Sequence, residues 1–104
     1  MTDFIPVLPL EELPPECARA VQVNGKEVLL CQTRGQLYAV SAICTHQQEP
    51  LAGGRIRRGH IACPLHGVRF NLETGEPVGQ LTREPLETFA VKAVQGMVHI
   101  VIED

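Results

Sequence analysis

The sequence is poor in aromatic residues, with no tryptophan, one tyrosine and three phenylalanines among its 104 residues. A chain of this length forms one domain by the usual size range and can bury a core without disulfide bonds. Because hydrophobic residues still make up 44% of the composition, the core has to be built mostly from Val, Ile, Leu and Ala. This composition favours β-strands, and we expect a single domain that spans residues 1–104.

Two further absences exclude whole classes of function. No hydrophobic run approaches the length of a membrane span, and the first sixteen residues are acidic and proline-rich where a signal peptide is basic and then apolar. The net charge is −3, and the nine basic residues are scattered except for Arg55, Arg57 and Arg58. We therefore expect a cytoplasmic protein that binds no membrane and no nucleic acid, and whose net charge suits a basic partner surface.

Frequent turn signals predict an all-β domain. Asn24-Gly25 separates residues 20–23 from residues 27–33 and predicts a tight hairpin, because both turn positions tolerate positive φ. Residues 37–43 are expected to return as a third strand that leads directly into Cys44. No segment predicts a helix of three turns.

The two ends of the chain carry weaker signals. Residues 86–94 and 97–103 flank Gln95-Gly96 and predict a final hairpin, which we expect to close the sheet that holds the N-terminal strands. The proline-rich segment 6–15 is expected to be a loop with at most one short turn.

The metal-binding side chains are concentrated in residues 42–78, which we expect to form a small subdomain on the β scaffold. Cys44 and His46 stand one residue apart, and after a spacer of sixteen residues Cys63 and His66 form a second group. Thiolate and imidazole both bind zinc and iron, so the ligand types alone do not identify the metal. The spacer has to return to its start, which a hairpin of residues 55–57 and 60–62 around Arg58-Gly59 would achieve.

The order of the ligands favours iron. Zinc fingers typically keep their cysteines on one element and their histidines on another, whereas each group here contributes one of each. The pattern Cys-x-His, sixteen residues, Cys-x2-His resembles the motif of the Rieske proteins, and Thr45, Pro64 and Gly67 beside the ligands resemble that family too. The resemblance continues through Phe70-Asn71 and Thr74-Gly75, and so covers most of the chain.

The resemblance implies a Rieske fold, an antiparallel β sandwich base with a small cluster-binding subdomain, and a [2Fe-2S] cluster. Cys44 and Cys63 would bind one iron and His46 and His66 the other. With two neutral imidazoles in place of two thiolates, the oxidised centre carries less negative charge, and its reduction potential is higher than that of a four-cysteine cluster.

Three departures from the family pattern bear on this potential. Rieske proteins of respiratory complexes are similar to this chain but carry a disulfide between the two ligand loops, where this sequence has Glu49 and Leu65. Those relatives also have a serine that donates a hydrogen bond to a cluster sulfur, where this chain has Val68. A missing donor and a nearby carboxylate both lower the potential, so we expect a value near the bottom of the Rieske range, about −150 mV.

The resemblance further implies an electron carrier without catalytic residues of its own. It is similar to the ferredoxins that carry electrons from an NAD(P)H-oxidising flavoprotein reductase to the terminal oxygenase of an aromatic-ring-hydroxylating dioxygenase system. We expect both partners to bind transiently, at an exposed tip that holds His46 and His66. The docking rim around that tip is expected to be Gln47, Gln48, Pro50, Leu51, Pro64 and Leu65.

Other readings of the same residues remain. The fold is shared by small subunits of assimilatory nitrite reductases, which generally lack the ligands, and a zinc-stapled interaction module would use the same four side chains. Cys17 and Cys31 have no histidine nearby, and we expect Cys31 to be a buried thiol. We expect His60 to be an exposed strand residue, His99 to be structural, and the three arginines of the hairpin to be a solvated surface.

Overall fold

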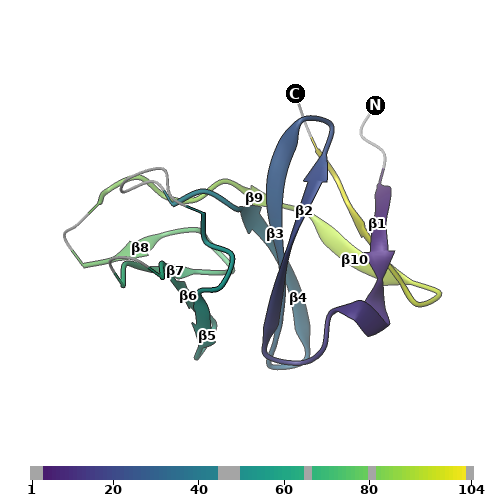
Figure 1. The fold of residues 1–104 in the computed structure, drawn as a ribbon, viewed down its shortest axis with the longest axis horizontal. Helices are drawn as coiled ribbons and strands as arrows, with labels where there is room; N and C mark the ends of the chain where they lie inside the picture. The colour runs from purple at the N-terminus through teal and green to yellow at the C-terminus, as the bar shows by residue number, and fades with distance from the viewer. Residues whose placement is uncertain (1–3, 45–49, 65–66, 80–81, 103–104) are drawn as a thin grey trace.

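The computed structural model describes residues 4–44, 50–64, 67–79 and 82–102. Within these ranges the chain forms three antiparallel sheets, which confirms the all-β prediction, and the longest axis measures 39 Å. Figure 1 shows the sheets side by side along this axis, with the strands of residues 55–78 at one end, those of residues 17–41 in the middle and those of residues 5–9 and 91–94 at the other end. No helix in the described part of the chain has the length and hydropathy needed to cross a membrane.

The central sheet has the strand order β2-β3-β4-β9. Its strands are β2 (Cys17–Val23), β3 (Lys26–Thr33), β4 (Gln36–Ser41) and β9 (Thr88–Phe89). Val23 pairs with Lys26 across the predicted two-residue turn, in which Asn24 and Gly25 have φ of 51° and 81°. Both positive values are those of a tight hairpin turn, and the predicted first hairpin is confirmed.

A second sheet joins the two ends of the chain in the order β1-β11-β10. Its strands are β1 (Ile5–Pro9), β10 (Val91–Val94) and β11 (Met97–Ile100). The prediction of a loop over residues 6–15 is therefore wrong at its start, although the expected short turn is present as a 3₁₀ helix, η1 (Leu10–Glu12). Proline is tolerated here because β1 is an edge strand, and its register shifts between Pro6 and Leu8.

The final hairpin forms around Gln95-Gly96 as predicted, but it does not close the sheet of β2 and β3. It pairs with β1 instead. The segment expected as one strand, residues 86–94, is divided between two sheets, because β9 pairs with β4 and β10 pairs with β11. The chain changes sheets at Ala90, as strands do at the corners of two packed sheets.

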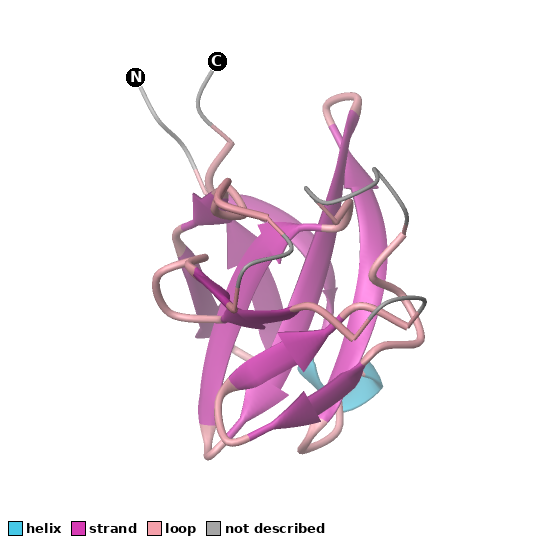
Figure 2. Ribbon diagram, turned by 90° about the vertical axis from the view of Figure 1, so that its left-hand side faces the viewer, coloured by secondary structure: helices cyan, strands magenta, loops and turns pink. Residues whose placement is uncertain are grey.

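The distal sheet has the strand order β5-β6-β7-β8. It consists of β5 (Arg55–Arg57), β6 (His60–Ala62), β7 (Arg69–Asn71) and β8 (Pro77–Val78). The predicted hairpin is confirmed, with Arg57 paired to His60 across Arg58 and Gly59, whose φ values are 53° and 79°. Figure 2 shows these short strands in front of the longer strands of the central sheet.

Strand β3 is buried on both faces and separates two hydrophobic clusters. Val28 and Leu30 belong to the cluster between the central sheet and the β1-β11-β10 sheet. Leu29 and Cys31 belong to the cluster between the central and distal sheets. Because successive side chains of a strand point to opposite faces, this one strand joins the sandwich base to the part of the molecule that carries the candidate ligands.

Candidate metal centre

Cys44 begins a loop that is closed at its base by backbone contacts. After β4 the chain continues through Ala42 and Ile43, and Ile43 forms an isolated β-bridge with Pro50 on the returning side. The backbone N–H of Leu51 donates to the carbonyl of Ala42 at 2.7 Å, and the N–H of Gly54 donates to Leu51 at 2.9 Å. The chain therefore returns beside β4 at a fixed position after Cys44.

Cys63 begins a second closed loop, between β6 and β7. Its backbone N–H donates to the carbonyl of Val68 at 2.8 Å, and its carbonyl accepts from the N–H of Gly67 at 2.9 Å. Gly67 has φ of 72°, a conformation that glycine adopts without steric cost. The turn residues thus fix where the chain leaves and re-enters the distal sheet.

Both cysteines lie in the same buried cluster. Cys44 is 1% exposed and Cys63 is 2% exposed, and both pack in the hydrophobic cluster between the central and distal sheets. The structure thus brings the two predicted thiol ligands from separate loops into one buried environment. His46 and His66 lie outside the described residues, so the predicted imidazole ligands are not placed.

The donors that are placed fit an iron–sulfur cluster. Cys44 and Cys63 supply two thiols in one hydrophobic environment, and thiolates are the soft ligands that an iron–sulfur centre requires. No disulfide links these two cysteines among the described residues. Within the described ranges no three His, Cys, Asp or Glu side chains form a metal site. Two of the four predicted ligands, His46 and His66, lie outside these ranges.

The other two cysteines differ from this pair in position. Cys17 is exposed at the start of β2, an edge strand. Cys31 is fully buried on β3, as predicted, and burial raises the pKa of its thiol to about 12. Neither cysteine begins a closed loop, although Cys31 packs in the same hydrophobic cluster as Cys44 and Cys63.

Both remaining histidines lie on strands and contact the backbone locally. The Nδ1 atom of His60 is 3.1 Å from the carbonyl of Arg58, and that of His99 is 3.1 Å from the carbonyl of Met97. Each is half-buried, so His60 is less exposed than expected, whereas the local contact of His99 agrees with a structural role.

The expected docking rim is wrong in one residue. Leu51 has no exposed surface and packs in the cluster beside the two cysteines, so it cannot contact a partner. Pro50 and Pro64 are exposed as expected, whereas Gln47, Gln48 and Leu65 lie outside the described residues. Sequence reasoning missed Leu51 as part of the site's hydrophobic wall, because its burial depends on packing between the central and distal sheets.

Val68 is 3% exposed and faces the same cluster. Its carbonyl holds the backbone of Cys63, while its side chain offers no hydrogen-bond donor. Other walls of this cluster come from more distant segments, since Leu86 is 3% exposed and its N–H donates to the carbonyl of Gly75 at 2.8 Å.

Comparison with known proteins identifies relatives over most of the chain. The sequence profile of the Rieske [2Fe-2S] domain matches residues 3–90. The ferredoxin component of naphthalene 1,2-dioxygenase/salicylate 5-hydroxylase systems from Ralstonia sp. is 34% identical over 83 residues, which cover 80% of each chain.

Two solved structures share the fold closely. The ferredoxin of carbazole 1,9a-dioxygenase from Nocardioides aromaticivorans IC177 superimposes with a TM-score of 0.87 at 28% identity, covering 93% of this chain and 95% of that one. A chain in the complex of reduced oxygenase and oxidised ferredoxin of carbazole 1,9a-dioxygenase gives a TM-score of 0.86 at 30% identity, covering 93% of this chain and 91% of that one.

Proposed function

The chain belongs to the Rieske [2Fe-2S] domain family, and from this premise we propose that it is the ferredoxin component of an aromatic-ring-hydroxylating dioxygenase system. It acts as a one-electron carrier and not as an enzyme in its own right. When bound, a [2Fe-2S] cluster supplies a centre that takes up and releases one electron. The observation that carries the proposal is the pair of buried cysteines, each at the start of a loop closed by backbone hydrogen bonds.

The proposed ligands are the four side chains of the sequence motif. Cys44 and Cys63 bind one iron, and His46 and His66 bind the other. The cysteine pair is supported by its position, since each of the two begins a loop closed by backbone hydrogen bonds and both pack in one hydrophobic cluster. The histidine pair is supported by the motif spacing of sixteen residues between the two groups.

The surrounding residues exclude water from the inner side of the site. Leu51, Ile61 and Phe70 have no exposed surface and pack with the two cysteines. A dry wall lowers the local dielectric and disfavours added charge, and Val68 supplies no side-chain donor to offset this effect. Both features favour a low reduction potential.

The proposed partners are a flavoprotein reductase that supplies the electron and a terminal oxygenase that receives it. The relatives support this, since one is named as a ferredoxin component of dioxygenase systems and a solved complex pairs a ferredoxin with its oxygenase. Exposed Pro50 and Pro64 beside the ligand loops leave room for contact. Binding is transient because a shuttle releases each partner in turn. We place the chain in the cytoplasm, where cysteines stay reduced.

Reconstitution tests the proposal. The holoprotein is added to the reductase and terminal oxygenase of naphthalene and of carbazole dioxygenase systems, with the native ferredoxin left out. Oxidised aromatic product should form in at least one system, in proportion to the iron content of the added protein. The same chain prepared without iron is the control. Failure to support product formation in both systems, while each native ferredoxin succeeds, would contradict the proposed partners.

Metal and sulfide analysis separates the remaining alternatives. The purified protein should contain about two irons and two acid-labile sulfides per chain and should take up one electron. A stoichiometric zinc content with no iron would instead support an interaction module. A chain without any metal, even after reconstitution, would fit the ligand-free subunits of nitrite reductases.

A further inference from the structure

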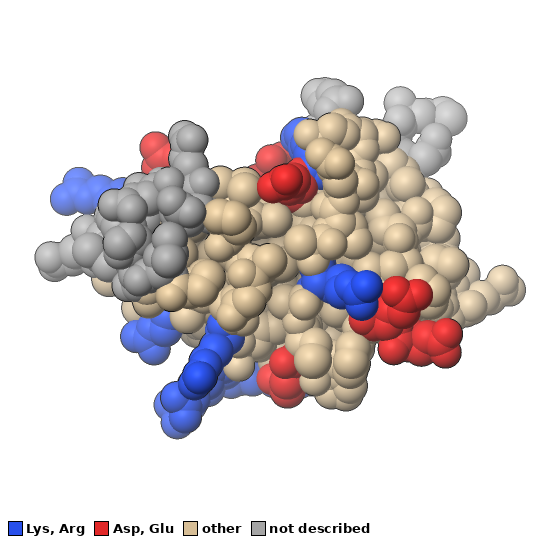
Figure 3. All heavy atoms as spheres, viewed as in Figure 1, with Lys and Arg blue, Asp and Glu red and all other residues tan. Residues whose placement is uncertain are grey.

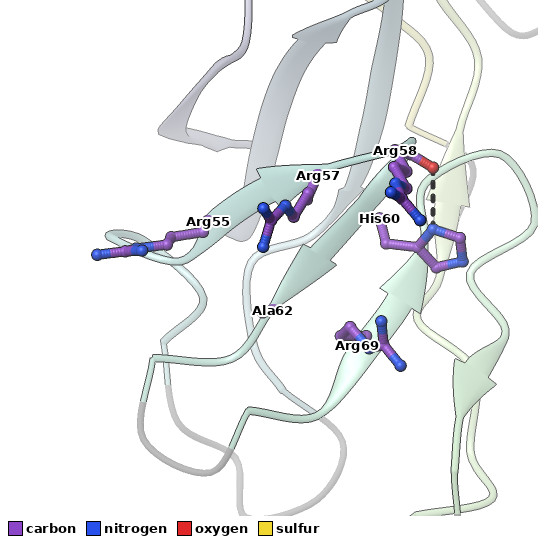
Figure 4. Close-up of a pocket in the computed structure, with 6 residues that line it drawn as sticks. All are labelled: Arg55, Arg57, Arg58, His60, Ala62 and Arg69. Carbon is purple, nitrogen blue, oxygen red and sulfur yellow. Dashed lines mark hydrogen bonds between the residues drawn. The ribbon is translucent and has the colours of Figure 1, made fainter.

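The solvent-facing side of the distal sheet holds an open hollow of about 500 Å³. It is lined by Arg55, Arg57, Arg58, His60, Ala62 and Arg69. Figure 4 shows these residues on β5, the β5–β6 turn, β6 and β7, around Ala62. We call this surface the arginine face.

Strand register places the three arginines of β5 and β7 on one side of the sheet. Arg55 pairs with Ala62, which pairs in turn with Arg69, and Arg57 pairs with His60. Residues paired directly across antiparallel strands project to the same face. The alternate residues Ile61 and Phe70 are fully buried on the opposite face, so burial fixes the direction in which the arginines point.

The arginines of this face have no acidic partner among the described residues. The ion pairs in the described part of the chain lie outside this face and join Arg19 to Glu12 and Lys26 to Glu87. Like charges on neighbouring strands repel one another and destabilise a sheet. The arrangement therefore does not stabilise the fold, but it would strengthen binding to an acidic surface.

The charge of the whole molecule makes the arginine face distinctive. The net charge is −3, yet four of the nine basic residues lie here. Figure 3 shows Lys and Arg atoms gathered at the lower edge of the distal lobe, with Asp and Glu atoms mainly over the other two sheets. An acidic protein is therefore attracted to this face and repelled by much of the remaining surface, which orients its approach.

The type of residue and its position indicate what the face binds. Guanidinium groups form paired hydrogen bonds with carboxylates, which lysine does not. Ala62 in the floor of the hollow directly precedes Cys63, and Arg69 directly follows Val68, whose carbonyl closes the Cys63 loop. A protein bound here lies beside a candidate ligand loop, as electron exchange requires.

We propose that the arginine face is a docking surface for a carboxylate-rich patch on a protein that exchanges electrons with this chain. This inference rests on the proposed function for the partner's role. It differs from the expectation, drawn from net charge alone, of a basic partner surface: at this site the complementary partner is acidic.

Charge reversal with a matched control tests the docking surface. The R57E/R69E variant reverses two charges on the arginine face, and the R19E/K92E control makes the same change in net charge on β2 and β10. All four side chains are exposed, and thermal unfolding and iron content of both variants are checked against the parent protein. Electron transfer from the reductase and to the oxygenase is then measured for the holoproteins at low and high salt.

We expect that charge reversal on the arginine face, and not on the control surface, slows electron transfer. R57E/R69E should slow transfer with at least one partner by about tenfold at low salt, whereas R19E/K92E should change it less than twofold. The parent rate should fall with added salt and the R57E/R69E rate should not. Equal effects of both variants, or none, would overturn the docking surface while leaving the proposed carrier function intact.

A second measurement does not need the redox partners. A fluorescent decaglutamate peptide is titrated with each oxidised holoprotein at low salt, and inorganic phosphate is tested as a competitor. Peptide binding by the parent and the control, weakened about tenfold in R57E/R69E, supports a surface for carboxylates. No peptide binding by the parent overturns the proposal, as does tighter binding of phosphate, which would indicate a small-anion site.

Discussion

The backbone N–H of Cys63 donates a hydrogen bond to the carbonyl of Val68 at 2.8 Å, and both side chains face one hydrophobic cluster. This bond holds a residue without a side-chain donor next to a candidate iron ligand. Hydrogen bonds to cluster or ligand sulfurs raise the reduction potential because they stabilise the added electron. The position of Val68 therefore offers a direct way to adjust the potential.

Replacing Val68 with Thr should raise the midpoint potential, because Thr has the same shape and adds a hydroxyl donor. A hydrogen bond that strengthens on reduction by about 1 kcal/mol corresponds to roughly 40 mV for one electron. A redox titration of V68T and V68S, followed by visible absorbance, measures the shift. V98T, which makes the same change in the other cluster, is the control. Potentials of V68T and V68S equal to that of V98T would show that residue 68 does not reach the centre.

Replacing His66 with Ala should leave a protein with less than half of the normal iron and sulfide content, because one iron loses a ligand. H46A should behave alike. H60A and H99A serve as controls, since both residues lie on strands and their rings contact nearby carbonyls. Iron analysis after identical reconstitution gives the comparison. Equal iron loss in H60A and H66A would contradict the assignment of His66 as an iron ligand.

The hairpins were predictable because their turns are encoded locally. Asn24-Gly25 and Arg58-Gly59 require positive φ at both turn positions, and a short stretch of sequence carries that information. The ligand motif is similarly local, so the sequence alone paired Cys44 with Cys63 and set Cys17 and Cys31 apart. The predictions that were wrong depended on contacts between segments that are far apart in the sequence.

Strand β1 illustrates such a loss. Pro6 and Pro9 indicate a loop by local rules, yet Ile5–Pro9 pairs with the far end of the chain, and only that partner reveals an edge position where proline is allowed. Leu51 is the equivalent case in the site. Its burial depends on packing between the central and distal sheets, which no pattern near residue 51 reports.

Iodoacetamide at pH 8 should label one cysteine of the holoprotein, and C17S should abolish that labelling. Cys17 is exposed, whereas Cys31 is buried with a thiol pKa of about 12, which leaves only about one part in ten thousand as reactive thiolate at pH 8. Cys44 and Cys63 are protected as ligands in the proposed site. Mass spectrometry of labelled peptides identifies the thiol, and comparable labelling of Cys31 would contradict its buried position. C17S should retain full iron content.

Replacing Gly75 with Ala should destabilise the fold by about 3 kcal/mol or more, because a Cβ there would overlap the carbonyl oxygen of Leu86. Gly96 is a matched control, since its φ of 77° is close to the 80° of Gly75 but its surroundings are open. G96A should cost only the strain of the left-handed backbone, about 1 kcal/mol. Urea unfolding of the two holoproteins measures the difference, and equal losses would mean that the contact with Leu86 adjusts freely.

Glu16 joins the start of β2 to the β3–β4 turn. The buried hydroxyl of Thr33 donates to its carboxylate at 2.7 Å, and the backbone N–H of Arg34 donates to the other oxygen at 2.9 Å. The Thr33 hydrogen bond is the main cause that holds the pKa of Glu16 below its ordinary value of 4.5, followed by the bond from Arg34.

A carboxyl whose pKa is lower in the folded state stabilises the fold above its unfolded pKa, and this contribution is lost as the pH falls through the folded value. E16Q should therefore be less stable than the parent at pH 7, and its free energy of unfolding should decline less steeply below about pH 4.5. E11Q is the control, because Glu11 is exposed and makes no side-chain hydrogen bond or ion pair within the described residues. Urea unfolding from pH 7 to pH 3 gives both quantities. Parallel pH profiles for E16Q and the parent would show that the two hydrogen bonds do not favour the ionised carboxylate.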